Sequence, residues 1–295
     1  MKVTGVLPLF LPICRRLWPG RLASVSATLV KATALESVTL VKATALEAAI
    51  LAGHMLLYPT GLTQERRQAD LPVPAGTARL PVPTGPPVVL LHGFIDNRSV
   101  FVLLRRSLAQ HGRQRVESLN YSPLTCDIRT AAELLGRHVE EICERTGSAQ
   151  VDIVGHSLGG LIARYYAQCL GGDVRVRTVV TLGTPHSGTR AIPLASAHPI
   201  VRQMRPDSPV IEELARPAPG CRTRFVSFWS DLDSVMAPLE AACVDHPDLE
   251  AHNIRVSGIG HLALPVHPTV AAGIREALDS ESAMRRQEGG GLTVA

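Results

Sequence analysis

Residues 151–160 read VDIVGHSLGG, and this stretch decides the fold of the chain. Three of its first four side chains are apolar, as in a strand that is buried on both faces of a sheet. Apolar side chains then recur at helical spacing over residues 158–170. A strand therefore meets a helix at Ser157. Gly155 and Gly159 leave room for the sharp turn that would project the serine hydroxyl away from the sheet.

Strand and helix patterns alternate on both sides of this turn. Short apolar runs typical of parallel strands lie at 88–91, 116–119, 151–154, 178–182, 224–228 and 253–256. Helix patterns lie at 99–110, 127–146, 158–170 and 265–278. This order predicts an α/β fold, a doubly wound and mostly parallel sheet of about six strands with helices on both faces. Ligands of such sheets bind at the carboxyl ends of the strands, which is where Ser157 lies.

The 295 residues divide into four regions by composition. Residues 1–58 are apolar and predict an N-terminal helical extension, in which TLVKATALE occurs twice, at 28–36 and 39–47. Seven prolines between residues 59 and 87 predict a connector, because proline has no N–H for a helix or a sheet. We expect the α/β domain at 88–280 and a flexible tail at 281–295.

The repeat belongs to one long predicted helix, from about residue 24 to residue 58, which has two interpretations. The helix packs on the α/β domain, or it associates with a membrane. A span needs about 20 mostly apolar residues, and four charges interrupt this one: Lys31, Glu36, Lys42 and Glu47. Lys2 followed by the apolar run 3–14 is also a candidate signal peptide, so we favour a membrane-associated or secreted protein over a cytoplasmic one. A chain beginning near Leu80 is then expected to be soluble and active.

The net charge of +4 is confined to the first 30 residues, which hold four basic side chains and no acidic ones. If the helix inserts, these basic residues stay in the cytoplasm by the positive-inside rule. The remainder is neutral and lacks the basic surface that nucleic acids need, so no nucleic-acid partner is expected. Nothing in the sequence indicates an oligomeric state.

The six cysteines include no C-x-x-C pair, which disfavours a zinc or redox motif. Cys221 and Cys243 flank one predicted strand. The sequence leaves open whether they are bonded, because it does not supply the geometry that a disulfide needs.

Four motifs together carry a resemblance to a known family: LHGF at 91–94, GHSLGG at 155–160, LGTPHSG at 182–188 and GIGH at 258–261. With them, residues 88 to about 280 resemble the lipase/esterase branch of the α/β-hydrolase family, whereas residues 1–87 contribute no motif. The resemblance implies a serine ester hydrolase that needs no cofactor and no metal. Its substrate would be a small-molecule acyl or lipid ester, which places the protein in lipid metabolism.

The resemblance also implies a catalytic triad in the chain order serine, acid, histidine. Ser157 is the candidate nucleophile. His261 follows the last predicted strand and a glycine-rich loop, and we favour it as the base over His267, beside the next helix. The family pattern matches WSDLDSVMAP at 229–238 with Asp233 as the acid, and Asp231 is the alternative.

Backbone N–H groups of Phe94 and Leu158 are the expected oxyanion hole, since the fold uses the residue after the nucleophile and one after an early strand. The predicted reaction is ester hydrolysis through an acyl-enzyme. A thioesterase or acyltransferase that uses the same triad is the alternative. A non-catalytic binding protein with this fold is the least favoured interpretation, since every triad position is filled.

Overall fold

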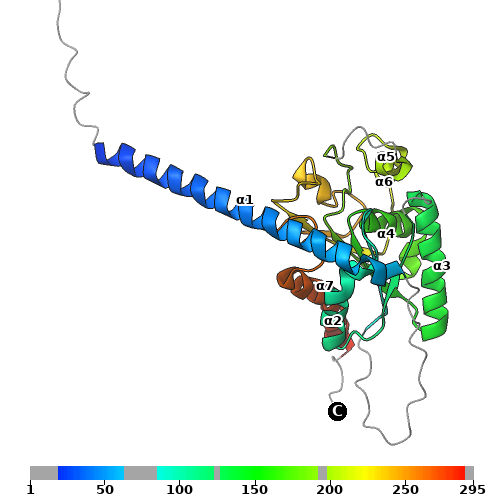
Figure 1. Ribbon diagram of the computed structural model, residues 1–295. Coiled ribbons are helices and arrows are strands. Elements are labelled where there is room, and N and C mark those ends of the chain that lie inside the picture. Colours follow the sequence, from blue (N-terminus) through cyan, green and yellow to red (C-terminus); the bar gives the residue numbers. More distant parts are fainter. Residues whose placement is uncertain (1–18, 63–84, 123–126, 192–197, 290–295) are drawn as a thin grey trace, which may run out of the picture. The chain divides into compact units, whose positions relative to one another are not determined.

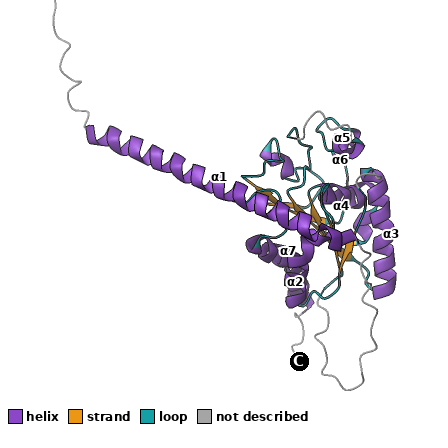
Figure 2. Ribbon diagram, viewed as in Figure 1, coloured by secondary structure: helices purple, strands orange, loops and turns teal. Residues whose placement is uncertain are grey.

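The computed structural model describes residues 19–62, 85–122, 127–191 and 198–289 of the chain. Six strands form one sheet in the order β2-β1-β3-β4-β5-β6, and every neighbouring pair is parallel. The strands, orange in Figure 2, are β1 (Val88–Leu91), β2 (Val116–Leu119), β3 (Val151–His156), β4 (Val176–Leu182), β5 (Arg224–Ser230) and β6 (Ala251–Val256).

Helices cover both faces of this sheet (Figure 1). On one face the core includes side chains of α3 (Ile128–Thr146), α4 (Leu158–Cys169), α5 (Pro199–Gln203) and α6 (Pro209–Leu214). On the other it includes those of α2 (Val102–Gln110) and α7 (Pro268–Gly289). Short 3-10 turns lie at η1 (Arg98–Phe101), η2 (Gly172–Val174) and η3 (Leu239–Ala242). The predicted doubly wound parallel sheet is confirmed.

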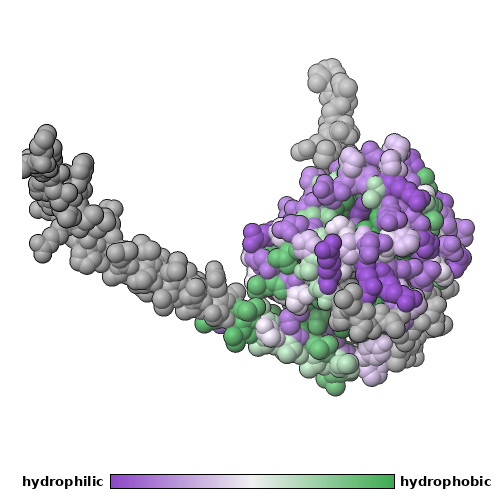
Figure 3. All heavy atoms as spheres, turned by 90° about the horizontal axis from the view of Figure 1, so that it is seen from above, coloured by the Kyte–Doolittle hydropathy of each residue, from purple (hydrophilic) through white to green (hydrophobic). Residues whose placement is uncertain are grey.

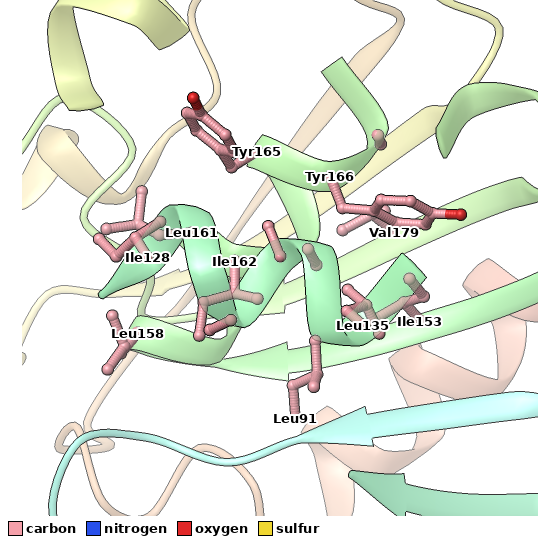
Figure 4. Packing of buried hydrophobic residues seen from close by; sticks show 14 of the residues in the cluster. Leu91, Ile128, Leu135, Ile153, Leu158, Leu161, Ile162, Tyr165, Tyr166 and Val179 are labelled. Carbon is pink, nitrogen blue, oxygen red and sulfur yellow. The ribbon is translucent and has the colours of Figure 1, made fainter. Parts of the chain in front are cut away.

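The core explains why most side chains of these strands are apolar. Every residue of β1, β3 and β4 is buried, because helices pack on both sides of them. Figure 4 shows one of the two layers, in which α3 and α4 lie over the strands. The side chains labelled there are Leu91, Ile128, Leu135, Ile153, Leu158, Leu161, Ile162, Tyr165, Tyr166 and Val179.

Several strands run further toward their carboxyl ends than their apolar runs predicted. β3 continues to His156, which pairs with Leu182, and β5 continues to Ser230, which pairs with Val256. Parallel pairing persists there although the side chains have become polar. The sheet itself therefore holds the residues that border the candidate site.

The chain divides into two compact units, Met1–Lys42 and Ala43–Ala295. Of the first, the structure describes only the beginning of α1 (Pro19–Leu62). This helix begins before the predicted residue 24 and continues past Pro59, where we expected it to stop. Side chains of the second unit bond the carbonyl groups of its last turn, so this turn is held although Pro59 donates no hydrogen bond. The rest of the predicted connector, residues 63–84, lies outside the described residues.

The segment between β4 and β5, here called the insertion (residues 189–220), forms α5 and α6, which pack on the α4 side of the sheet. One further difference concerns the end of the chain. The helix α7 continues to Gly289, although the composition predicted a tail from residue 281. Cys221 and Cys243 are both free thiols, so the disulfide that the sequence left open is absent from this structure.

Candidate active site

Ser157 occupies a strained turn between β3 and α4. Its φ is 53° and its ψ is −118°, and it is the one non-glycine residue with a positive φ in the described part of the chain. A Cβ at Gly155 would lie 2.6 Å from the Cα of Gly160. A Cβ at Gly159 would collide with the carbonyl of Leu91. Both predicted glycines are therefore required by the close approach of backbone to this turn.

Hydrogen bonds from the next strand hold the turn in place. The backbone N–H of Ser157 donates to the carbonyl of Leu182 at 2.9 Å, and Oγ1 of Thr184 donates to the carbonyl of Ser157, also at 2.9 Å. A helix begins directly after the serine, so its N-terminus points partial positive charge toward this position. The strain is thus sustained by surrounding contacts, as at many functional sites.

A buried pair of side chains, His261 and Asp233, lies at the ends of β5 and β6. Nδ1 of His261 donates to Oδ2 of Asp233 at 2.8 Å. The other oxygen of this carboxylate accepts the N–H of Val235 at 2.9 Å. Gly183, at φ 53°, makes space, since a Cβ there would lie 2.9 Å from both Oδ2 of Asp233 and Nδ1 of His261. The carboxylate therefore fixes the tautomer that leaves Nε2 of His261 unprotonated.

The pKa of His261 reflects this environment. Burial alone would lower the pKa, because it penalises the imidazolium. The charge and hydrogen bond of Asp233, with the charges of Glu47 and Asp96, nevertheless raise the pKa of His261 above its ordinary value. The imidazole is thus a stronger base than a histidine in water, which is what a proton acceptor in a cleft requires.

The alternative residues have other partners. Asp231 accepts a hydrogen bond from Gly258 N and pairs with the guanidinium of Arg255, each at 3.0 Å. His267 donates its N–H to the carbonyl of Ala263 at 2.9 Å, and its Nδ1 accepts the N–H of Thr269 at the start of α7. Both side chains serve the local loops, and the structure does not bring either to the Asp233–His261 pair.

His156, the residue before the serine, joins the elbow to His261. The two imidazole rings lie 4.8 Å apart, and Nε2 of His156 donates to the carbonyl of His261 at 3.2 Å. Nδ1 of His156 is 3.4 Å from the buried carboxylate of Asp96. His54, from α1, is 3.2 Å from the other oxygen of that carboxylate. Burial opposes ionisation, but these two imidazoles hold the pKa of Asp96 well below its ordinary value.

The loop that carries Phe94, one of the expected oxyanion donors, is firmly held. Nδ1 of His92 donates to the carbonyl of Gly93 at 2.8 Å. Tyr121 stacks on the imidazole of His92 at 4.4 Å and donates its hydroxyl to the carbonyl of that residue. A Cβ at Gly93 would lie 3.4 Å from the Cβ of Ser157, so this loop runs directly beside the serine.

The second expected donor, Leu158, is the first residue of α4, so its N–H has no acceptor within the helix. The insertion also contacts this part of the site: Phe94 meets His198 edge to face at 5.3 Å. His186, in the loop after β4, is buried and bonds Oγ1 of Thr181 at 2.9 Å. His186 therefore supports the loop after β4.

Three polar residues near the site were not singled out from the sequence: Glu47, His54 and Asp96. The first two lie in an apolar helix, where an ionisable side chain is costly unless it has a partner. This cost is a signal in the sequence by which Glu47 and His54 could have been found. It indicates that each has a partner elsewhere in the chain, but it does not identify the partner.

Comparison with known proteins agrees with this geometry. Residues 86–207 match the family model described as the alpha/beta hydrolase fold. Triacylglycerol lipases from Pseudarthrobacter phenanthrenivorans and Burkholderia plantarii are each 32% identical over 111 residues, which is 35% of this chain. The match covers 34% and 30% of those two proteins, so the chain spans about a third of the length of the curated relatives it matches.

A solved structure gives the same fold. The crystal structure of Aspergillus fumigatus lipase B superposes with a TM-score of 0.59 and 16% identity, over 66% of this chain and 52% of that one. The parallel sheet and its helices therefore have the α/β-hydrolase fold, and residues 86–207 match the model of that family. The matched region is similar to triacylglycerol lipases, and the resemblance to the lipase/esterase branch is confirmed at that level.

Proposed function

We propose that this protein is a serine ester hydrolase of the lipase/esterase type that acts through an acyl-enzyme. The observation that carries the proposal is the strained Ser157 next in sequence to His156, which bonds the carbonyl of a buried histidine whose Nδ1 lies 2.8 Å from a carboxylate. A hydroxyl is a poor nucleophile unless a base takes its proton, and this arrangement would supply both the hydroxyl and an oriented base. The similarity to triacylglycerol lipases supports an ester as the substrate.

The proposed reaction has two halves. Oγ of Ser157 attacks the ester carbonyl carbon while Nε2 of His261 takes the hydroxyl proton, and Asp233 stabilises the imidazolium through Nδ1. The N–H groups of Phe94 and Leu158 bind the oxyanion. The intermediate collapses, the C–O bond to the alcohol breaks, and the alcohol leaves with the proton from Nε2. Water then repeats the attack on the acyl-enzyme, which releases the acid and restores Ser157.

A thioesterase or acyltransferase remains the alternative, because the same triad would cleave a thioester or pass the acyl group to an alcohol in place of water. Parallel assays with p-nitrophenyl esters and with acyl thioesters of the same chain length would rank these leaving groups. Product analysis in the presence of an acceptor alcohol distinguishes hydrolysis from transfer.

The direct test is covalent labelling by a fluorophosphonate together with p-nitrophenyl ester hydrolysis. We expect the native protein to be labelled and active, and Ser157→Ala to be neither. Ser187→Ala, at an exposed serine five residues after the end of β4, is the matched control and should behave like the native protein. A protein that is folded but unlabelled and inactive on esters of two to sixteen acyl carbons would instead support the non-catalytic binding protein.

The second half of α1 also suggests a membrane surface as partner. The segment Leu40–Gly61 of α1 is long and apolar enough to cross a membrane by length and composition alone. Exposed apolar side chains lie around most of the circumference of this segment, and Figure 3 shows some of them in green. They are Leu40, Val41, Leu46, Leu51, Met55, Leu56, Leu57 and Tyr58.

One face of this segment is engaged by the sheet domain, which favours a helix that lies along a membrane over one that crosses it. Ala43 is buried, Ile50 packs on the core, and Glu47 and His54 have partners in the domain. A helix held in this way would meet a membrane surface with its exposed apolar side chains.

Flotation of the full chain with phosphatidylcholine vesicles tests this proposal. Met55 and Leu56 are 69% and 80% exposed, so M55S/L56S removes apolar surface without touching the core. We expect less of this variant than of the native protein to float. Equal flotation of the two would contradict the role of these exposed side chains, as would native protein that remains entirely with the soluble fraction.

A further inference from the structure

One acidic side chain of α1 reaches the loop that carries His261. Glu47 lies in the second copy of the TLVKATALE repeat and faces the sheet domain. Its Oε2 accepts the N–H of Leu262 at 3.0 Å, and its Oε1 accepts the N–H of Ala263 at 2.9 Å. One carboxylate therefore binds both backbone N–H groups that follow His261 in sequence.

Gly260, the residue before His261, leaves space for the side chain of Glu47. A Cβ at Gly260 would collide with the Glu47 carboxylate. Glu47 is thus packed against residue 260 and bonded to residues 262 and 263, so it brackets the histidine on both sides. Charge-assisted bonds from N–H groups to a carboxylate are roughly twice as strong as neutral ones. This bracket is therefore a substantial restraint on where the imidazole lies.

We propose that Glu47 is a positioning residue for His261, so that the N-terminal helix completes the active site. This inference rests on the proposed function, in which His261 is the base. Asp233 holds the tautomer and the plane of the imidazole, but it does not fix the backbone of the loop. Glu47 supplies that second restraint from an element more than two hundred residues earlier in the chain, at a separation of 215 residues from Leu262.

Other contacts fix the position of α1 on the domain, so that Glu47 stays at the loop after His261. The amide of Asn97 donates to the carbonyl of Tyr58 at 2.8 Å, and that of Asn120 donates to the carbonyl of Gly61 at 2.6 Å. Together with His54 beside Asp96, these contacts fix the helix two to four turns beyond Glu47. A chain that begins near Leu80 lacks all of them. Contrary to the expectation from sequence, such a chain should therefore lose most of its activity.

Glu47 also acts on His261 through its charge. The groups that face this imidazole are Asp233 after β5, Asp96 after β1, His156 in the elbow and Glu47 from α1. Burial lowers the pKa of His261, whereas the three carboxylates raise it. Removing the charge of Glu47 should lower this pKa. Because the base acts in its neutral form, the acid limb of kcat/KM should move to lower pH.

The experiment compares Glu47→Gln with Glu36→Gln in the full chain. Glu36 holds the same place in the first repeat copy, so the two substitutions are matched in local sequence. We expect Glu47→Gln to lower kcat by about ten- to a hundredfold with little change in KM, as for the loss of one charge-assisted hydrogen bond. Fluorophosphonate labelling should slow in proportion, and the acid limb should shift downward. Glu36→Gln should change none of these.

A double-mutant cycle separates positioning from general destabilisation. Gly260→Ala should reproduce the loss in the native background, because its methyl group displaces the carboxylate. In a Glu47→Ala background the space is empty, so Gly260→Ala should add little. Losses that simply multiply would overturn the proposal, as would native kcat and an unshifted pH profile in Glu47→Gln.

The outcomes also separate this inference from the proposed function. If the native protein is neither labelled nor active on esters, the proposed function fails. If it is labelled and active while Glu47→Gln matches it in every assay, only the role of Glu47 fails. Should Glu47→Ala not fold, the isosteric Glu47→Gln still decides the matter through its pH profile.

Discussion

Replacing Asp233 by asparagine removes one charge and one acceptor from the buried pair with His261. The carboxylate accepts two hydrogen bonds, from Nδ1 of His261 at 2.8 Å and from Val235 N at 2.9 Å. Asparagine has a single oxygen for these two donors. If that oxygen stays with Val235, the amide NH2 faces Nδ1 of His261 and favours the tautomer with the proton on Nε2. In that tautomer the histidine cannot accept the proton of Ser157.

The expected loss in kcat is about 10³- to 10⁴-fold, which is the effect of a wrong tautomer in a serine triad. At about 1.4 kcal/mol for each tenfold, this corresponds to ~4–5.5 kcal/mol of transition-state stabilisation. The pH profile should move as well. Asp233 raises the pKa of His261, so its neutralisation lowers that pKa and shifts the acid limb of kcat/KM to lower pH.

Asp231→Asn is the matched control, two residues away. This carboxylate is partly exposed and bonds Gly258 N and Arg255, so its loss should cost no more than a few-fold in kcat. Both variants are assayed by p-nitrophenyl ester hydrolysis across pH 5–9, with circular dichroism to verify folding. A larger loss in Asp231→Asn than in Asp233→Asn would refute the assignment of the acid.

Three further outcomes are expected. Ser157→Ala should abolish fluorophosphonate labelling and lower ester turnover by about 10³-fold or more, because triad members act as a unit. The variant should still show a cooperative thermal unfolding transition. Asp152→Asn should reduce the free energy of unfolding in urea by about 3–5 kcal/mol, since the buried guanidinium of Arg177 loses its carboxylate and that of Arg113 keeps only the exposed Asp279. Dithiothreitol should leave the melting temperature unchanged, because Cys221 and Cys243 are free, and a downward shift would show that they are bonded.

Local patterns were sufficient for the strands and for the turn at the serine. β1 and β2 have the bounds that their sequence runs predicted. The ends of β3 and β5 were predicted too early. Their last residues, His156 and Ser230, are polar, and only pairing with neighbouring strands keeps them in the sheet. Pairing is a property of the assembled sheet, which a single run of sequence does not display.

The candidate site likewise contains residues that the sequence predicted and residues that it did not. The sequence singled out Ser157, Asp233 and His261 because each follows a strand in a motif of its own. It did not single out Glu47, because the partners of this residue are backbone N–H groups, which carry no signature in the side-chain sequence. The charges in α1 were weighed as obstacles to membrane insertion, whereas in the structure Glu47 and His54 are its contacts with the domain.

The bracket between α1 and the loop after β6 also has a consequence for biosynthesis. The helix is translated early, but the loop it binds is made 215 residues later, which at 5–20 residues per second is roughly 10–40 s. Ser157 is synthesised partway through that interval, before the proposed base and before the loop that Glu47 binds. On the proposed function, a nascent chain therefore carries an unreactive serine until translation has passed residue 263.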